Sequence, residues 1–286
     1  FKIFGKFFQT KMNKTLKTRL IPILLYKDGL IVKSRQFKMF QTVGNPFSQV
    51  ARFNRWNLDE LIYLNISKDK NFFQNSDKQY TSSTGSGLKF LPDKKIDVFD
   101  FVNILSKNCF MPLAYGGGIN TIEMARKILK SGADKICINT AAFKNNNFIT
   151  SCSKEFGSQA VIVSIDCKKK LDKNIVFIEN GKIDTGVDLI DWIRDAEQLG
   201  AGEILVNSID KDGIGMGFDS NLCKLSVDNT SIPIIVCGGA GRIKHFVDIY
   251  KESNPHALSA ANIFQFTEDS YQNIKKELKD YKINLR

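Results

Sequence analysis

Two short glycine-rich turns are the first residues in this sequence whose types and spacing could do chemistry. YGGGI (115–119) and CGGAG (237–241) each follow an apolar run and precede a segment with apolar residues at helical spacing. Glycines in such a turn let backbone N–H groups approach an anion, and the N-terminus of the following helix adds partial positive charge. This pattern indicates phosphate binding, and the alternative for either turn taken alone is an ordinary tight turn.

The two turns belong to an internal repeat, which strengthens the phosphate interpretation. MPLAYGGGINTIEMARKIL (111–129) aligns with IPIIVCGGAGRIKHFVDIY (232–250), so that the paired glycines of one turn fall over those of the other. ELIYLNIS (60–67) likewise aligns with EILVNSID (203–210). Two related glycine turns indicate a substrate that carries a phosphate at each end.

The elements that must position these turns are eight apolar, strand-like runs separated by amphipathic segments of helical length. Such alternation is typical of a parallel sheet covered by helices, and eight strands in two related halves predict an α/β fold, the (βα)8 or TIM barrel. Active sites of these barrels lie at the C-terminal ends of the strands, which is where both glycine turns fall. The expected strands are 19–25, 60–66, 112–116, 134–139, 160–166, 203–209, 233–239 and 256–261, and the expected helices are 121–132, 186–200, 245–253 and 270–281.

The chain is expected to form one domain. Residues 17–286 hold all eight strands, and residues 1–16 are expected to be an N-terminal tail outside the fold. The first half of the barrel is longer than the second, and the polar, Ser/Thr/Gly-rich stretch at 69–95 supplies the extra length. In a barrel this long loop opens on the C-terminal face.

Composition excludes several classes of protein. With 43% hydrophobic and 25% charged residues, the chain is expected to be globular rather than disordered. The formal charge of +11 would suit nucleic acid, but the lysines are scattered instead of forming a stripe with interleaved aromatics, so nucleic-acid binding is not expected. Six cysteines without CxxC spacing and only two histidines argue against a metal site. No apolar stretch approaches the roughly 18 residues that span a bilayer. We therefore expect a cytoplasmic protein without membrane segment, metal or cofactor.

A resemblance to a known family rests on five segments. In chain order these are VSIDCKK (163–169), TG (185–186), AGEILVNSIDKDG (201–213), PIIVCGGAG (233–241) and ANIFQF (261–266). They resemble the cyclase subunit family of imidazole glycerol phosphate synthase (HisF-like) over about residues 17–286, interrupted mainly at 69–95. That family is a (βα)8 barrel of the lyase type that docks a glutaminase on its N-terminal face, draws ammonia through the barrel and uses it on a bisphosphorylated substrate. The resemblance implies a HisH-like glutamine amidotransferase partner in a heterodimer and a phosphorylated small-molecule substrate.

The functional residues of the family carry over one by one. Its four charged gate residues match Arg19, Glu60, Lys135 and Glu203, for which interlocking salt bridges are the alternative interpretation, because ionisable groups inside a barrel are costly unless paired. Its substrate-contacting lysine matches Lys33, for which a solvated loop lysine is the alternative. Its phosphate contacts match Gly117, Gly118, Asn139 and Thr140 in the first half, and Asp212, Gly213, Gly238, Gly239, Ala261 and Asn262 in the second.

The family's catalytic pair of aspartates is matched on one side only. Asp166 closes VSID and is the candidate acid or base, but the position of its partner, in IPILLYKDG (21–29), holds Leu25. Leucine cannot transfer protons, and removing one of such a pair typically lowers the rate by about 10²–10⁴. Asn65 also replaces an aspartate that the family has at the end of its second strand. Ring-closing chemistry is therefore expected to be weakened or redirected.

Three functions follow from this pattern. The first is an enzyme subunit diverted to another ammonia acceptor: a branch of the family that resembles this sequence at the leucine and at YGGGI is associated with surface-polysaccharide synthesis, where an acetamido sugar becomes an amidine. The second is a noncatalytic scaffold and ammonia conduit for a separate amidotransferase. The third, the related isomerase barrel of histidine synthesis, also needs an acid on its first strand and lacks the four-residue gate, so it is disfavoured.

Overall fold

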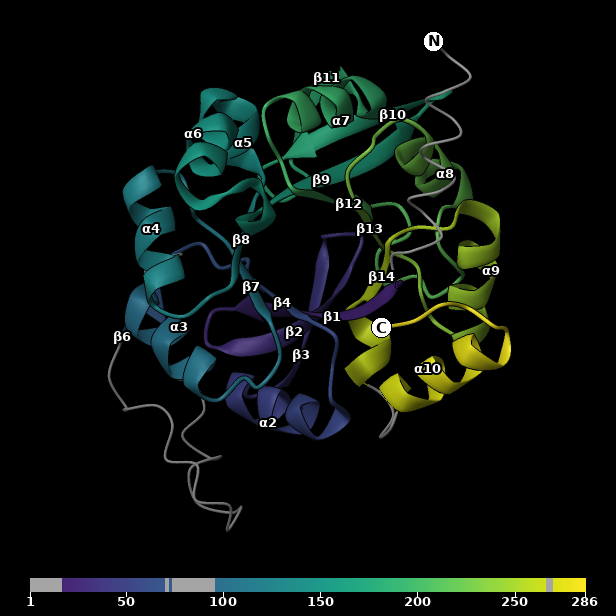
Figure 1. Cartoon of the computed structure of the whole chain (residues 1–286), viewed down its shortest axis with the longest axis horizontal. Helices are drawn as coiled ribbons and strands as arrows, with labels where there is room; N and C mark the ends of the chain where they lie inside the picture. Colours follow the sequence, from purple (N-terminus) through teal and green to yellow (C-terminus); the bar gives the residue numbers. More distant parts are fainter. Residues whose placement is uncertain (1–16, 70–71, 74–95, 266–269) are drawn as a thin grey trace.

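The fold is a closed barrel of eight parallel strands surrounded by helices (Figure 1). The computed structural model describes residues 17–69, 72–73, 96–265 and 270–286. The expected tail at 1–16 and nearly all of the expected loop at 69–95 lie outside these residues. Pairing of β8 with β9 closes the sheet, which confirms the predicted (βα)8 barrel. In order around the barrel, the strands are β1 (Arg19–Lys27), β4 (Leu61–Asn65), β7 (Leu113–Gly116), β8 (Lys135–Ile138), β9 (Val161–Lys170), β12 (Glu203–Ser208), β13 (Ile234–Cys237) and β14 (Ala257–Ala260).

The barrel strands form because each is a run of apolar residues that is buried on both faces. Side chains alternate between the two sides of the sheet: Ile21, Ile62 and Ile162 fill the barrel interior, whereas Leu20 and Val163 pack against the helices. Burial of each such side chain stabilises the fold by about 1.5–3 kcal/mol. The register of each strand therefore decides which of its residues point into the barrel.

Helices between successive barrel strands surround the outside of the barrel (Figure 1). Several begin at a side chain that accepts a hydrogen bond from the first turn, as Asp188 does from the Ile190 N–H group. None of the helices in the described ranges is long and apolar enough to cross a membrane. The helices are α2 (Pro46–Trp56), α3 (Val98–Lys107), α4 (Ile122–Lys130), α5 (Thr140–Lys144), α6 (Asn147–Phe156), α7 (Leu189–Gln198), α8 (Ser220–Asp228), α9 (Ile243–Ser253) and α10 (Ser270–Asp280), with two 3-10 turns, η1 (Ser158–Ala160) and η2 (Asn262–Gln265).

Two hairpins that the sequence analysis did not predict extend opposite sides of the barrel mouth. β2 (Leu30–Arg35) and β3 (Met39–Gly44) continue from β1, and β10 (Lys173–Ile178) and β11 (Ile183–Asp188) continue from β9. A further two-residue pair joins β5 (Phe72–Phe73) to β6 (Ile96–Asp97). The helix expected at 186–200 starts later, at Leu189, because the residues before it pair with β10.

The half-barrel repeat reappears in the backbone hydrogen bonds. The Leu61 N–H group donates to the Pro112 carbonyl at 2.9 Å, and the Ile204 N–H group donates to the Pro233 carbonyl at 3.0 Å. These four residues occupy matching positions in the two aligned halves. Residues at matching positions can therefore be compared directly across the barrel.

Candidate active site

A polar arc lies on one side of the barrel mouth. Asp166 projects inward from the C-terminal part of β9, Asn139 follows β8 on one side of it, and Asn207 lies on β12 on the other side. The Asn139 side chain donates to Asp166 Oδ2 at 2.8 Å, and the Asn207 side chain donates to Asp166 Oδ1 at 3.5 Å. The carboxyl group is thereby held between two amides.

The environment of Asp166 brings its pKa close to neutrality. Burial raises the pKa of its carboxyl group from 3.8 to about 7, with a smaller contribution from the nearby Asp212, although the two amide hydrogen bonds oppose the shift. A carboxyl group that is half-ionised near pH 7 is suited to act as a general acid or base.

An apolar arc forms the other side of the mouth. Leu25 pairs in register with Leu64 of the neighbouring strand β4, and both side chains pack on the apolar cluster inside the barrel together with Cys237 and Ala261. These four residues come from adjacent strands or strand ends, β13, β14, β1 and β4. Burial raises the pKa of the Cys237 thiol to about 12, so this residue is neutral as well. The arc facing Asp166 thus offers no ionisable group at neutral pH.

Asn65 belongs to neither arc of the barrel mouth, which corrects the expectation that it affects the chemistry there. Its neighbour Leu64 points into the barrel, so Asn65 faces the other side of the sheet. Asn65 is 1% exposed, and its Oδ1 atom accepts a hydrogen bond from the Ser67 N–H group at 3.0 Å. The residue stabilises the turn that follows β4.

The glycine turn of the first half packs directly on a neighbouring turn. Gly117 has φ +121°, and a side chain there would overlap the backbone carbonyl of Asn65. Gly118 also has a positive φ, +77°. Thr140 begins α5, and its hydroxyl accepts a hydrogen bond from the Glu179 N–H group at 3.0 Å. Close packing of backbone therefore explains Gly117 without any ligand, while the turn still lies at the C-terminal end of β7.

The glycine turn of the second half is built in the same way. Gly238 has φ +96°, and a Cβ atom there would lie 2.8 Å from the Ser208 carbonyl oxygen. Gly239 has φ +103°, and its carbonyl accepts a hydrogen bond from the Gly217 N–H group at 2.8 Å. The strand-end turns after β12 and β13 are thus locked together.

A hollow of about 460 Å³ opens beside this turn. Lys33 and Ser34 of β2, Gly213 of the turn after β12, and Asn262 at the start of η2 contribute to its lining. The structure therefore gathers the predicted residues Lys33, Gly213 and Asn262 around one space, although they are far apart in the sequence.

Asp212 joins the first hairpin to this hollow. Its Oδ2 atom accepts a hydrogen bond from the Ser34 hydroxyl at 2.5 Å, and the Asn262 side chain donates to the Ser34 carbonyl at 2.9 Å. Burial raises the pKa of the Asp212 carboxyl group, while hydrogen bonds from Ser34, Phe37 and Gln36 oppose the shift. The carboxylate of Asp212 therefore positions the β2–β3 hairpin.

The four charged residues Arg19, Glu60, Lys135 and Glu203 form a closed ring of ion pairs at the opposite end of the barrel. Arg19 lies 2.6 Å from Glu60 and 2.7 Å from Glu203, and Lys135 lies 2.9 Å from Glu60 and 2.7 Å from Glu203. Burial alone would raise the pKa of Glu203, but Arg19 and Lys135 outweigh it and lower that pKa. The ring has no net charge, so each ionised group inside it is compensated.

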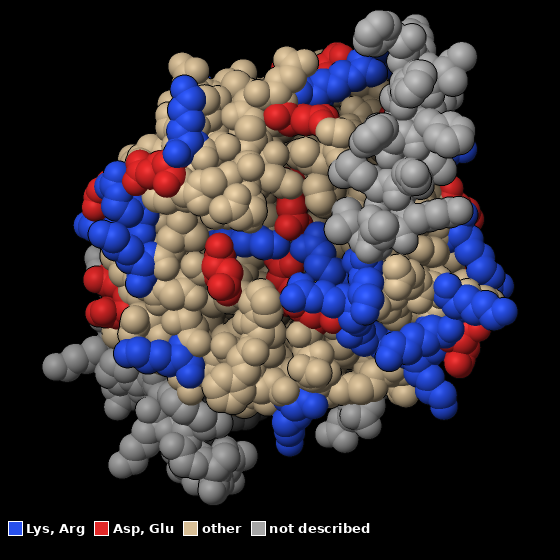
Figure 2. Space-filling view, viewed as in Figure 1, with Lys and Arg blue, Asp and Glu red and all other residues tan. Residues whose placement is uncertain are grey.

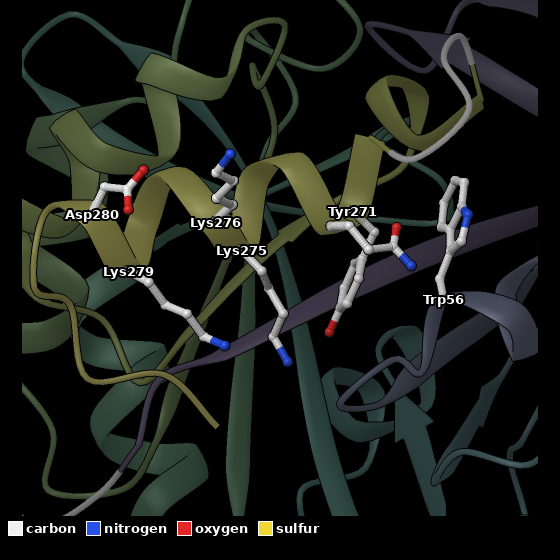
Figure 3. A pocket seen from close by; sticks show the side chains of 7 residues that line it. Trp56, Tyr271, Lys275, Lys276, Lys279 and Asp280 are labelled. Atoms are coloured by element: carbon white, nitrogen blue, oxygen red, sulfur yellow. The ribbon is translucent and has the colours of Figure 1, made fainter.

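Basic side chains gather on one side of the face around this ring. The Arg286 N–H group donates to the Thr18 carbonyl just before β1, so the C-terminus marks the face of strand N-termini. Figure 2 shows acidic and basic side chains meeting at the centre of this face, with further Lys and Arg side chains toward α9 and α10. A second hollow, of about 340 Å³, lies between α2 and α10, where Lys275 and Lys279 extend on the same side as the Tyr271 hydroxyl (Figure 3).

A closed (βα)8 barrel with an ion-pair ring at one end and an acid-bearing mouth at the other has the layout of a barrel enzyme. The chain matches the family described as "Histidine biosynthesis protein" over residues 91–269. It is 37% identical to imidazole glycerol phosphate synthase subunit HisF of Streptococcus mutans over 272 residues, which cover 95% of this chain and 100% of the relative. The HisF subunit of Alkaliphilus metalliredigens is 35% identical over 269 residues, 94% of this chain and 98% of the relative. The chain belongs to this HisF family.

Two functional candidates were missed by the sequence analysis. Asn207 was not singled out, although it holds Asp166, and Ser34 was not singled out, although it connects Asp212 with Asn262. The internal repeat contains a signal for the first: Asn207 aligns with Leu64, so a polar residue stands in one half where the other half has an apolar one. Ser34 had no such signal, because the β2–β3 hairpin was not expected.

Proposed function

We propose that this chain is an ammonia-using subunit that receives ammonia from a glutaminase partner and transfers it to a phosphorylated substrate at the barrel mouth. The observation that carries the proposal is the arrangement along the barrel: the ion-pair ring of Arg19, Glu60, Lys135 and Glu203 at one end and Asp166 at the other. The family resemblance supports an entrance function for the ring, and its net neutrality allows one pair to open while the charges stay partly compensated.

The interior between the two ends favours neutral ammonia over ammonium. Its apolar lining consists of Ile21, Ile23, Ile62, Ala114, Cys137, Ile162, Leu205, Ile235 and Ala257. The hydroxyl groups of Ser164 and Ser259 also face this interior. Moving an ammonium ion through such surroundings is costly because the charge loses its hydration, whereas ammonia carries no net charge. Basic side chains toward α9 and α10 suit a partner that covers this end and releases ammonia directly into the ring. Phe110, which precedes the N-terminal end of β7 and is 83% accessible, would add an apolar contact.

Two features support a phosphorylated substrate. The glycine turns after β7 and β13 both present backbone at the mouth, and Lys33 lines the hollow of about 460 Å³ beside the second turn. Backbone N–H groups and a lysine are the usual partners of a phosphate group. A substrate with a phosphate at each end would span the mouth between the two turns and place its reacting centre near Asp166.

The reaction at the mouth differs from ring closure in this proposal. Ring closure in the family uses two aspartates, whereas the residue across from Asp166 is Leu25, within an apolar arc. One carboxyl group with a pKa near 7 can move a proton during attack by ammonia on a single carbonyl carbon. Conversion of an acetamido sugar of a surface polysaccharide to an amidine begins with such an attack: the new C–N bond forms, two protons pass from the ammonia nitrogen to the amide oxygen, and that oxygen leaves as water. The apolar arc would accommodate the acetamido methyl group.

The alternative is a noncatalytic scaffold that conducts ammonia to a separate amidotransferase. The absence of an acid at Leu25 favours it, whereas the two amides that hold Asp166 favour catalysis. The discriminating experiment supplies the chain, its glutaminase partner, glutamine and a nucleotide-linked acetamido sugar, and follows amidine formation by mass spectrometry. Asp166→Asn should reduce product by about 10²–10⁴ if Asp166 transfers a proton. Unchanged product formation in this variant would identify the scaffold instead.

A further inference from the structure

Asn207 has a buried side-chain oxygen that no group in the described part of the chain uses as a hydrogen-bond acceptor. Its amide N–H group donates to Asp166 Oδ1 at 3.5 Å, which directs its Oδ1 atom away from the carboxylate. That oxygen is excluded from solvent and has no hydrogen-bond partner among the described residues. A Cβ atom on Gly238 would lie 3.0 Å from it, so the oxygen faces the glycine turn of the second half. An unpaired buried carbonyl oxygen is costly, which indicates that a ligand donates to it.

The barrel interior restricts which hydrogen-bond donor can reach the Asn207 Oδ1 atom from the end that holds the ion-pair ring. The lining between the ion-pair ring and the mouth is mainly apolar, interrupted by the inward-facing hydroxyl groups of Ser164 and Ser259, so a small neutral molecule passes most readily. The Ser259 hydroxyl, at the level of Ile21, already donates to the Val236 carbonyl at 2.9 Å. Asp166 and Asn207 then offer adjacent acceptors at the mouth, because the two residues are paired in register between β9 and β12.

We propose that Asn207 is a positioning residue for the nitrogen nucleophile: its N–H group holds Asp166, and its Oδ1 atom accepts a hydrogen bond from ammonia arriving through the barrel. The inference rests on the proposed function in one respect, the passage of ammonia along this route. With two of its three hydrogens directed to Asp166 and Asn207, ammonia has its lone pair turned toward the opposite, apolar arc, where a substrate carbonyl would lie.

The position that matches Asn207 in the first half of the barrel holds a residue that cannot accept a hydrogen bond from ammonia. Leu64 aligns with Asn207 in the repeat and pairs in register with Leu25, just as Asn207 pairs with Asp166. Leu64 and Leu25 have no polar side-chain atoms. Of the two register pairs, the one that offers side-chain acceptors at the mouth is therefore Asp166 with Asn207, next to Asn139.

The experiment follows the NMR signal of the Asp166 carboxyl carbon and does not depend on catalytic turnover. In protein labelled with 13C at aspartate Cγ, the Asp166 signal is assigned by its loss in Asp166→Asn, and ammonium chloride is titrated against sodium chloride at equal ionic strength and mildly alkaline pH. We expect ammonium, but not sodium, to shift the signal in the native chain. Asn207→Leu, which keeps the branching at Cγ and removes both polar groups, should weaken the apparent ammonium affinity roughly fivefold, as expected for one lost hydrogen bond. Asn207→Thr retains a hydrogen-bond donor and an acceptor, so its apparent ammonium affinity should be close to that of the native chain.

Each outcome bears on the inference. An ammonium-specific shift that is equal in the native chain and Asn207→Leu would overturn it, and so would a native chain that responds equally to ammonium and sodium. Should Asn207→Leu fail to fold, Asn207→Thr compared with Asn207→Ala decides the same question. Failure of the proposed function looks different: no acceptor is aminated, while the ammonium response of Asp166 and its dependence on residue 207 persist.

Discussion

Leu25 and Asp166 occupy corresponding places on opposite sides of the barrel mouth. Leu25 on β1 pairs with Leu64 on β4, and Asp166 on β9 pairs with Asn207 on β12, four strands further around the barrel. The repeated architecture thus carries an apolar pair in one half and a polar pair in the other. This division, rather than the glycine turns that both halves share, distinguishes the two sides of the site.

The burial of Asp166 predicts a pH-dependent cost in stability. Its pKa is raised from 3.8 to about 7 in the folded chain, so between these values the folded state binds more protons than the unfolded state. The free energy of unfolding therefore falls as pH rises through this window. Asp166→Asn, which cannot ionise, should be more stable than the native chain by about 2–4 kcal/mol above about pH 8 and close to it near about pH 4. Urea unfolding at both pH values measures the difference, and a pH-independent difference would refute the assignment.

The ion-pair ring predicts strong coupling between its members. Arg19→Met leaves two buried glutamates facing one lysine, which should lower the free energy of unfolding by about 3–5 kcal/mol. Arg19→Met combined with Glu203→Gln restores neutrality and should recover part of this loss. Denaturant unfolding of both single variants and the double variant completes the cycle. Losses that simply add would show that the four groups do not act as a unit.

The glycine turn of the second half predicts a steric difference between two positive-φ glycines. Gly239→Ala adds a Cβ atom that overlaps the Gly217 carbonyl, whereas at Gly186 a Cβ atom meets nothing within 4 Å. Both changes incur about 1–2 kcal/mol of backbone strain, and Gly239→Ala should lose about 1–3 kcal/mol more through the overlap. Thermal unfolding compares the two variants. Equal losses would mean that the turns after β12 and β13 are not packed as closely as described.

The barrel itself could be predicted from the sequence because its signals are local. Each strand is an apolar run flanked by a turn, and the glycines at 117–118 and 238–239 mark matching strand ends. The β10–β11 hairpin escaped prediction because β10 (KNIVFI) holds only four consecutive apolar residues, and β11 (IDTGVD) is largely polar and runs directly into α7.

The direction of single side chains was harder to predict. Asn65 and Leu64 are neighbours, and only the register of β4 determines that Leu64 faces the mouth while Asn65 is turned away. Asn207 became recognisable as a partner of Asp166 only through the pairing of β9 with β12. The position of Leu25 was expected from the family pattern, and the structure adds the apolar neighbours that surround it.

The most direct test of the central claim, that Leu25 has redirected the chemistry, is an assay for imidazole glycerol phosphate. The chain is incubated with an ammonium salt and the bisphosphorylated cyclase substrate, beside a Leu25→Asp variant and a Leu25→Asn control of similar size. The account predicts little or no product from the native chain and from Leu25→Asn, and a gain of about 10²-fold or more in Leu25→Asp, where a second acid faces Asp166. Turnover by the native chain equal to that of Leu25→Asp would contradict it.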